Sequence, residues 1–208
     1  MKEFKFSRVL NFNIKENLTK MNIYIKKELK EKTTQILFFP LILFIPSFTI
    51  RVIGVILLCS AMLVNDIKNK NIELLYFLPF SKKELFVYNL TFSFFVVSIT
   101  SAFDKVYYNL SILEGLQVIL KMLIVLVAIY GISMLFTALG HDGFVWSIVI
   151  TIADALLGDL GSTNLNAPEF NPYSLISFTK QGSIILAFLY ACLICFLAYI
   201  VYVKKGGE

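Results

Sequence analysis

Few residues of this chain could carry out acid–base, nucleophilic or metal chemistry. Its 208 residues include one histidine, His141, and three cysteines, Cys59, Cys192 and Cys195, which all lie in apolar runs. A metal site, or a nucleophile paired with a base, requires several such groups close together. Cys192 and Cys195 share a helix face, but no histidine or further cysteine follows them. We interpret the cysteines as small hydrophobic residues and His141 as a solvated or capping residue in a turn.

Asp154 is the only ionisable residue that we place clearly inside a predicted membrane span. Carboxylates are costly in lipid, which makes such a residue a functional candidate by default. It lies within a few residues of the end of its span, close to Asp159, where it could reach water. An interfacial or structural role and a role in substrate binding or gating are both open.

The composition is that of an integral membrane protein. Apolar residues make up 58% of the chain and charged residues only 16%, and the mean hydropathy is +0.77. Soluble domains average about 45–50% apolar and about 25% charged residues. The net charge of +5 does not predict a nucleic-acid partner, because no polar surface interleaves basic and aromatic residues. The expected surroundings are a lipid bilayer.

The apolar runs predict an all-α membrane protein with six transmembrane helices and both termini in the cytoplasm. This topology leaves only Arg51, Lys105, Lys121 and Lys180 outside, in agreement with the excess of basic residues in cytoplasmic loops. A tight turn is expected at 140–143, and outer loops at about 104–117 and 158–181. The predicted spans are two short helices within 36–64, then about 81–103, 118–139, 144–157 and 182–203.

The run over residues 36–64 could be one long helix or a hairpin. A single helix of that length would extend about 43 Å, well beyond a hydrocarbon core of about 30 Å. It would also place the basic residues of the 66–84 loop outside, opposite the basic N-terminus. We therefore predict a short hairpin that turns at about 47–51.

Residues 1–33 are polar and strongly basic, and they predict a cytoplasmic or interfacial region ahead of a transmembrane domain over 34–208. Met21, Ile25 and Leu29 recur every four residues, as on one face of a helix lying at the membrane surface. Charge pairs four residues apart, such as Glu28 with Lys32, support a surface helix. Residues 1–20 predict a second, weaker helix, and Met21 is an alternative start of the natural chain.

Residues 65–85 are charged, amphipathic and broken by a proline between two apolar runs. Pro79 should end a short helix over about 71–78, since helices tend to stop before proline. Ser81 then stands at the N-cap of the next span with Glu84 at its third position, the pattern of a capping box. We interpret the segment as a rigid cytoplasmic protrusion that offers apolar side chains to another protein. The alternative is a loop helix that rests on lipid.

The order of motifs here resembles the permease subunits of type-2 ATP-binding-cassette (ABC) exporters, which export drugs, peptides and polysaccharides. In that family a Lys-Glu-Leu-like triplet ends an interfacial helix before the first span. After the second span, Glu-Leu-Leu, Leu-Pro, a serine and basic residues lead into the third. The matching residues over about 21–90 are Lys27-Glu28-Leu29, Glu73-Leu74-Leu75, Leu78-Pro79, Ser81 and Lys82-Lys83-Glu84-Leu85, with Asn171-Pro172-Tyr173 in the last outer loop.

The resemblance implies a transport subunit that moves its substrate with ATP hydrolysed by a separate subunit. The chain contains no Gly-x-x-x-x-Gly-Lys-Ser/Thr phosphate loop, so we expect it not to be an enzyme and ATP and Mg to be bound by the partner. A plasma-membrane location and a second permease, identical or homologous, are also implied. The residues expected to contact the ATPase are Glu73, Leu74, Leu75, Tyr76, Phe77, Leu78 and Pro79.

Three alternative functions are open. An ion-coupled secondary carrier usually has several ionisable groups at the membrane midplane, and Asp154 alone supports it weakly. A membrane-embedded hydrolase would need a second acid or a base within the spans, and we place neither there. A non-transporting assembly or immunity protein is a further alternative.

Small residues are frequent on the fourth span: Gly131, Ser133, Thr137 and Gly140. Such residues favour close helix packing in lipid, so we predict a dimer face there.

Overall fold

Helices form nearly all the regular structure of this chain. The computed structural model describes residues 3–68 and 80–205, and within these ranges it contains no strand, only an isolated bridge between Ser162 and Phe170. The predicted all-α class is confirmed for these residues. The helices are α1 (Glu3–Glu31), α2 (Thr33–Leu43), α3 (Phe48–Cys59), the π-helix η1 (Ser60–Val64), α4 (Asn65–Lys68), α6 (Lys82–Tyr107), α7 (Ile112–Ala138), α8 (Gly143–Asp159), α9 (Tyr173–Ile176) and α10 (Ile184–Lys205).

Among the described residues, four segments are long and apolar enough to cross a membrane: Phe48–Ile67, Lys82–Asp104, Ile112–Ala138 and Ile184–Lys205. The other two predicted spans correspond to shorter helices. The 11 residues of α2 and the 17 of α8 extend about 16 Å and about 25 Å. Both are shorter than a hydrocarbon core of about 30 Å.

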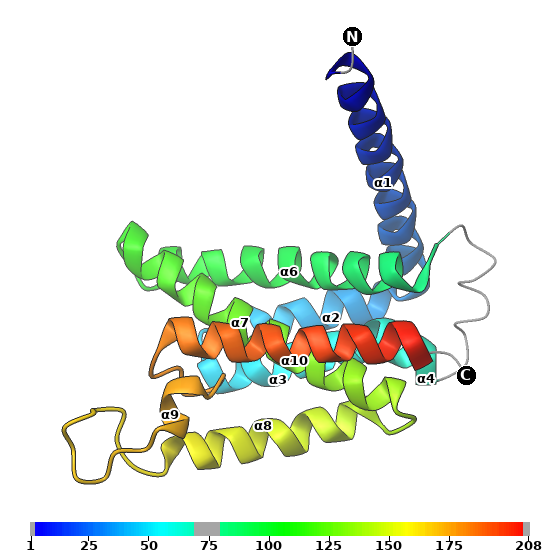
Figure 1. Cartoon of the computed structure of the whole chain (residues 1–208). Coiled ribbons are helices and arrows are strands. Elements are labelled where there is room, and N and C mark those ends of the chain that lie inside the picture. Colours follow the sequence, from blue (N-terminus) through cyan, green and yellow to red (C-terminus); the bar gives the residue numbers. More distant parts are fainter. Residues whose placement is uncertain (1–2, 69–79, 206–208) are drawn as a thin grey trace.

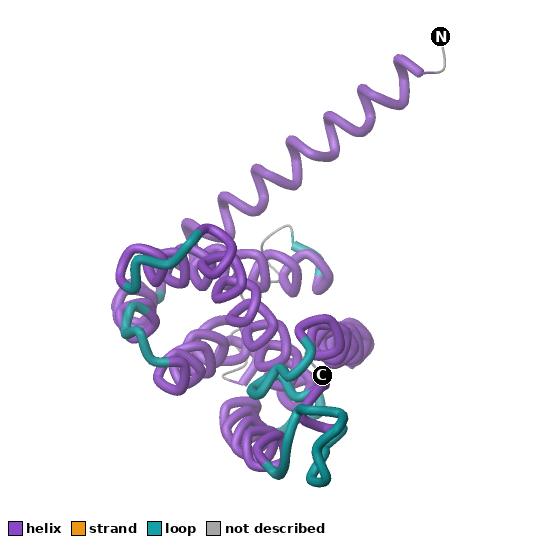
Figure 2. Tube along the Cα trace, turned by 90° about the vertical axis from the view of Figure 1, so that its left-hand side faces the viewer, coloured by secondary structure: helices purple, strands orange, loops and turns teal. Residues whose placement is uncertain are grey.

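The long helices run side by side, and α1 projects at a steep angle from the end of the bundle where α6 starts (Figure 1). The end of α10, the start of α6 and α4 lie at one end of this bundle, and α9 lies at the other. In Figure 2, α1 extends away from the bundle as a single rod. The sequence predicted two helices in this region, whereas α1 is continuous from Glu3 to Glu31.

The predicted hairpin is present, because α2 and α3 are separate helices that pack against each other. The chain turns at residues 44–47, slightly earlier than expected, and Ser47 has an extended backbone before α3 begins. Pro40 lies inside α2 without ending it. The guanidinium of Arg51 donates from Nε to the carbonyl of Ile45 at 2.9 Å and pairs with both carboxylate oxygens of Asp104. This buried pair fixes the turn to the end of α6.

The predicted outer loop at 104–117 is wrong for most of its length. Helix α6 continues to Tyr107, and α7 already begins at Ile112. The cause is a second capping box, in which Glu114 N donates to Ser111 Oγ at 3.3 Å and Ser111 N donates to Glu114 Oε2 at 2.9 Å. Polar residues therefore extend both helices beyond their apolar parts.

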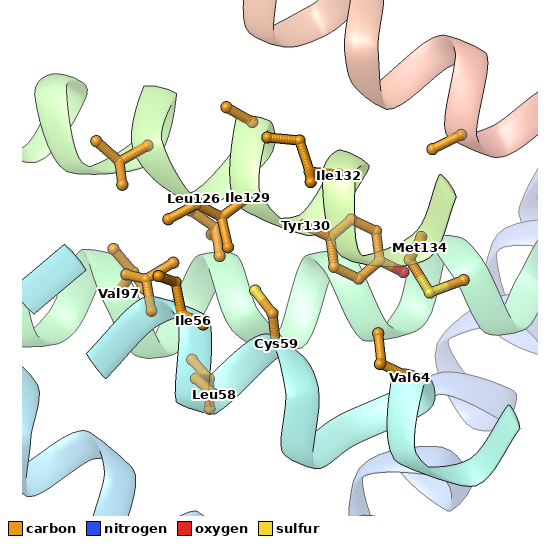
Figure 3. Packing of buried hydrophobic residues seen from close by; sticks show 14 of the residues in the cluster. Ile56, Leu58, Cys59, Val64, Val97, Leu126, Ile129, Tyr130, Ile132 and Met134 are labelled. Carbon is orange, nitrogen blue, oxygen red and sulfur yellow. The ribbon is translucent and has the colours of Figure 1, made fainter. Parts of the chain in front are cut away.

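Helix α7 is the centre of the core, with α3, α6, α8 and α10 packed around it. Figure 3 shows its residues Leu126, Ile129, Tyr130, Ile132 and Met134 together with residues of α3, η1 and α6. The Tyr130 hydroxyl donates to the carbonyl of Phe86 at 2.9 Å, which links α7 to α6.

The small residues of α7 pack within the chain, which contradicts the predicted dimer face. A Cβ atom on Gly131 would lie 2.9 Å from the backbone of Cys195 on α10. The hydroxyl of Ser133 lies 2.5 Å from that of Ser147 on α8, and Thr137 and Gly143 meet at the same crossing. For Gly131, Ser133 and Thr137 the close partners are α8 and α10 of the same chain, whereas Gly140 lies beyond the end of α7 and a Cβ there would meet no atom within 4 Å.

Candidate functional site

The residues expected to contact an ATPase, Glu73 to Pro79, lie outside the described residues. Their immediate neighbours are described, and α1 contacts those on both sides. Asp66 of α4 precedes the segment, and Phe80 and Glu84 follow it. We call this contact region the α1 junction, formed by Lys20, Lys27, Glu28 and Glu31 of α1 and by Lys32, which lies between α1 and α2, with Asp66 and Glu84.

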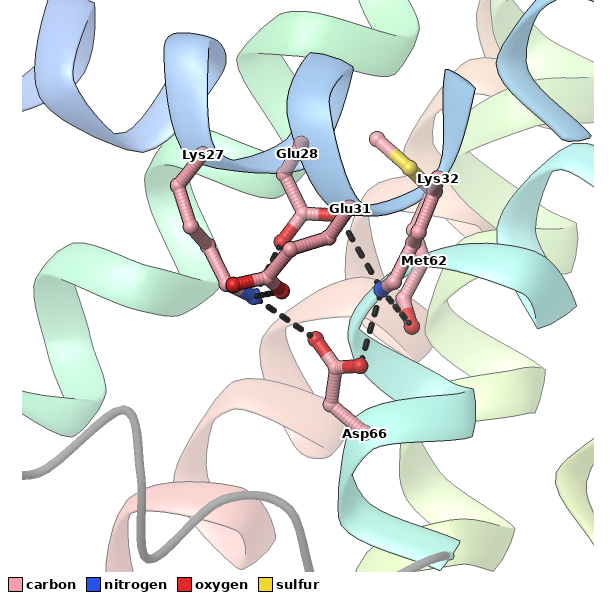
Figure 4. A network of polar contacts seen from close by, with 6 residues as sticks. All are labelled: Lys27, Glu28, Glu31, Lys32, Met62 and Asp66. Atoms are coloured by element: carbon pink, nitrogen blue, oxygen red, sulfur yellow. Dashed lines mark hydrogen bonds and ion pairs between the residues drawn. The ribbon is translucent and has the colours of Figure 1, made fainter. Parts of the chain in front are cut away.

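On the first side, Lys27 of α1 and Lys32, at the N-cap of α2, pair with Asp66 (Figure 4). The ammonium of Lys27 lies 3.0 Å from Glu28, 3.0 Å from Glu31 and 3.5 Å from Asp66 Oδ2. The ammonium of Lys32 lies 3.0 Å from Glu28 and 2.9 Å from Asp66 Oδ1. Glu28 therefore bridges Lys27 of α1 and Lys32 at the start of α2, and Asp66 joins both lysines to α4.

Most of this cluster is buried, which was not predicted. Glu28 is 0% exposed, Asp66 4% and Lys32 9%, although the spacing of Glu28 and Lys32 had indicated a surface pair. A buried charge is strongly destabilising unless it is paired, so each carboxylate needs a lysine here. Burial acts to lower the pKa of Lys27, but the charges of Glu28 and Asp66 outweigh it and the pKa is raised. Lys27 thus keeps its charge at neutral pH.

Lys32 also binds a break in the neighbouring helix. Helix α3 continues into the π-helix η1, where Met62 has a non-helical ψ of −130°. The ammonium of Lys32 donates to the Met62 carbonyl at 3.1 Å. π-helical turns are rare and occur frequently at functional sites. The kink at Met62 lies in the helix that leads to Asp66. Lys32 therefore contacts this helix at two points, the Met62 carbonyl and the Asp66 carboxylate.

On the second side, α1 contacts the start of α6. Glu84 N donates to Ser81 Oγ at 3.2 Å, and Ser81 N donates to Glu84 Oε2 at 2.7 Å, so the capping box is present. The other oxygen of Glu84 lies 3.1 Å from the ammonium of Lys20. Hydrogen bonds to Glu84 and Glu16 raise the pKa of Lys20, which keeps this lysine charged.

Three aromatic rings pack beside this contact. Tyr24 of α1 lies 6.4 Å from Phe80 and 6.2 Å from Tyr88, measured between ring centroids, and Phe80 lies 6.1 Å from Tyr88. All three side chains are buried. The α1 junction therefore combines ion pairs with an aromatic contact and holds both flanks of residues 69–79.

Asp154 lies far from the α1 junction, at the opposite end of the bundle, where α8 ends near α9. It accepts hydrogen bonds from the Tyr173 hydroxyl at 2.6 Å, the Ser177 hydroxyl at 2.7 Å, and Thr179 through both its backbone N–H at 3.0 Å and its hydroxyl at 2.7 Å. Burial and the bond to Asp154 raise the pKa of Tyr173. Both carboxylate oxygens are thus engaged, and this geometry favours the structural interpretation of Asp154 over substrate binding.

An apolar groove of about 440 Å³ lies between α3 and α8. No sequence pattern had indicated it, because it depends on how the two helices diverge. Thr179, which binds Asp154, contributes to its edge. The apolar side chains that line it include Phe48, Val52, Ile56, Ile148 and Ile152.

No family model, curated protein or solved structure matches this chain.

Proposed function

We propose that this chain is the membrane-spanning permease subunit of an ABC exporter in the plasma membrane. It would move its substrate with ATP hydrolysed by a separate subunit, as a dimer with a second copy or a homologous permease. The observation that supports this most is the α1 junction, which holds both flanks of residues 69–79. That segment carries the Glu-Leu-Leu and Leu-Pro motifs on which the family resemblance rests.

The α1 junction provides routes by which force could enter the bundle. A push on residues 73–79 would reach Asp66 and the kink at Met62 on one side, and so bend the end of the α3 segment. On the other side it would reach Ser81 and Glu84, where the capping box ties the backbone directly to α6. Because α1 binds both sides through ion pairs, the two helices would move together with α1.

The groove between α3 and α8 suits an apolar or amphipathic cargo. Its lining is almost wholly hydrophobic, and α3 belongs to the segment that bends at Met62. Closure of the ATPase dimer would therefore change the helix that forms one wall of the groove. Alternating access between the two sides of the membrane is the mechanism we infer from this arrangement.

The first test is affinity purification of the tagged chain from native membranes in mild detergent, with co-purified proteins identified by mass spectrometry. We expect an ATP-binding subunit with the parent chain and its loss with Leu75→Asp. Leu165→Asp is the matched control, because Leu165 is 71% exposed in the outer loop. Equal recovery of the ATPase with both variants would refute residues 73–79 as the contact. Recovery of no ATPase with any chain would favour a carrier or a non-transporting protein.

A further inference from the structure

A second, smaller pocket lies at the opposite end of the bundle from the α1 junction. It has a volume of about 230 Å³ and lies where the α2–α3 turn meets the end of α6 and the first half of α7. Its polar lining residues include Arg51, Asp104, Tyr108 and Lys121, and Phe48, Val118 and Met122 supply an apolar wall. The site does not depend on the proposed transport function.

The charges of this pocket do not cancel. Arg51 and Asp104 form a buried bidentate pair and neutralise each other. Lys121 adds a positive charge, and within residues 3–68 and 80–205 its ammonium has no hydrogen-bond or ion-pair partner. Lys121 is exposed at the rim of this pocket, and an ammonium group without a carboxylate partner is a point charge that suits a phosphate.

The position of Lys121 is fixed by its backbone. Gln181 donates from Nε2 to the carbonyl of Lys121 at 2.9 Å and to that of Phe178 at 2.7 Å, which ties this turn of α7 to the chain before α10. The Tyr108 hydroxyl donates to the carbonyl of Pro46 at 2.6 Å and holds the other side of the pocket. Tyrosines concentrate at the level of lipid headgroups, which places the pocket at that depth.

We propose that this pocket binds a phosphate group through Lys121, and that the phosphate belongs to the headgroup of an anionic phospholipid. Its volume is below the about 300–1,000 Å³ that enclose a drug-sized ligand, so it accepts a headgroup and leaves the acyl chains outside. Phe44 and Phe48 are 40% and 43% exposed beside the pocket and offer an apolar surface to those chains. A soluble phosphoester presents the same chemistry without the chains.

The test is native mass spectrometry of the purified full chain with equal amounts of phosphatidylglycerol and phosphatidylcholine of identical acyl chains. We expect preferential retention of phosphatidylglycerol, a roughly fivefold loss of that preference in Lys121→Gln, and its recovery in Lys121→Arg. Lys180→Gln is the control, because Lys180 lies at the same end but pairs with Asp159. The same preference in Lys121→Gln as in the parent, or an equal loss in Lys180→Gln, would overturn the assignment.

A second arm separates the two sources of phosphate. Glycerol phosphate is added to the parent chain carrying bound phosphatidylglycerol. Displacement of the lipid supports recognition of the phosphate itself, and retention of the lipid supports a contribution from its chains. Binding of glycerol phosphate together with no preference between the two lipids would refute the lipid as the ligand.

Discussion

At the scale of single residues, Asp66 is the carboxylate that joins α4 to the α1 junction. It is the only described residue outside α1 that pairs with both Lys27 and Lys32. Removing the Asp66 carboxylate would leave the largely buried ammonium groups of Lys27 and Lys32 with one fewer carboxylate to pair with. The energetic effect should greatly exceed that of an exposed ion pair, because removing one partner of a buried pair costs about 3–5 kcal/mol.

We therefore expect Asp66→Asn to lower the free energy of unfolding by about 3 kcal/mol. Thermal unfolding of the purified chain in detergent, followed by circular dichroism, measures this. Asp159→Asn removes the same charge from an exposed pair with Lys180 and should cost no more than about 1 kcal/mol. Equal losses in the two variants would mean that the cluster is solvated and does not fix α1.

At the scale of helices, the part of the chain that the structure describes contains two capping boxes of the same kind. Ser81 and Glu84 start α6, and Ser111 and Glu114 start α7. They differ in what lies beside them: Glu84 binds Lys20 of α1, whereas α7 begins at the other end of the bundle. Comparing the two capping boxes can therefore separate the effect of helix stability from the effect of the contact with α1.

Ser81→Ala and Ser111→Ala should each lower stability by about 1 kcal/mol, the usual cost of losing an N-cap. If the proposed function is correct, only Ser81→Ala should reduce substrate-stimulated ATP hydrolysis by the reconstituted complex, because only that box links residues 69–79 to a span. The assay compares both variants with the parent at equal amounts of assembled complex. A similar fall in both would show that general stability, and not the link to α6, sets the rate.

The same boxes show what could be predicted from the sequence. The start of α6 was predicted because Ser81 and Glu84 precede an apolar run. The same signature at Ser111 is followed by only three apolar residues among the next six, so the apolar run alone predicts that α7 starts at Val118, six residues late. Hydropathy locates the part of a helix that lies in lipid, whereas capping determines where the helix begins.

The α1 junction could be predicted only in part. The charge pairs four residues apart are present, as the spacing of Lys27 with Glu31 indicated. The burial of these pairs could not be predicted, because it involves contact with Asp66. That residue is distant in sequence, and the α2–α3 hairpin brings it beside α1. The dimer face predicted on α7 failed for a related reason, since small residues do not reveal whether their partner helix belongs to the same chain.

At the scale of the whole molecule, the bundle has two distinct ends. One carries the α1 junction, the start of α6 and the end of α10, and the other carries the α2–α3 turn, α9 and the pocket beside Lys121. The predicted orientation places the first end in the cytoplasm. The asymmetry of basic residues supports this orientation.

Single cysteines at the two ends test the orientation. We expect Leu165→Cys, in the exposed outer loop, to react with a membrane-impermeant maleimide on intact cells. Lys205→Cys at the end of α10 should react only after the cells are made permeable. The native cysteines should react slowly, since Cys59 is buried and the others are partly buried. The opposite pattern of labelling would invert the topology and remove residues 69–79 from the cytoplasm.

The shortness of α2 has a consequence for the surrounding lipid. Phe92 of α6 packs on Met62, level with the charged end of α1, and Phe103 packs on Phe44 at the outer turn. These two levels of α6 are separated by about 16 Å of helix, roughly half the thickness of a bilayer core. If α1 lies at the membrane surface as predicted, we expect the acyl chains beside the corner formed by α1 and α2 to tilt or compress. The bilayer would then be thinner on this flank, and movement of α1 would work against its elasticity.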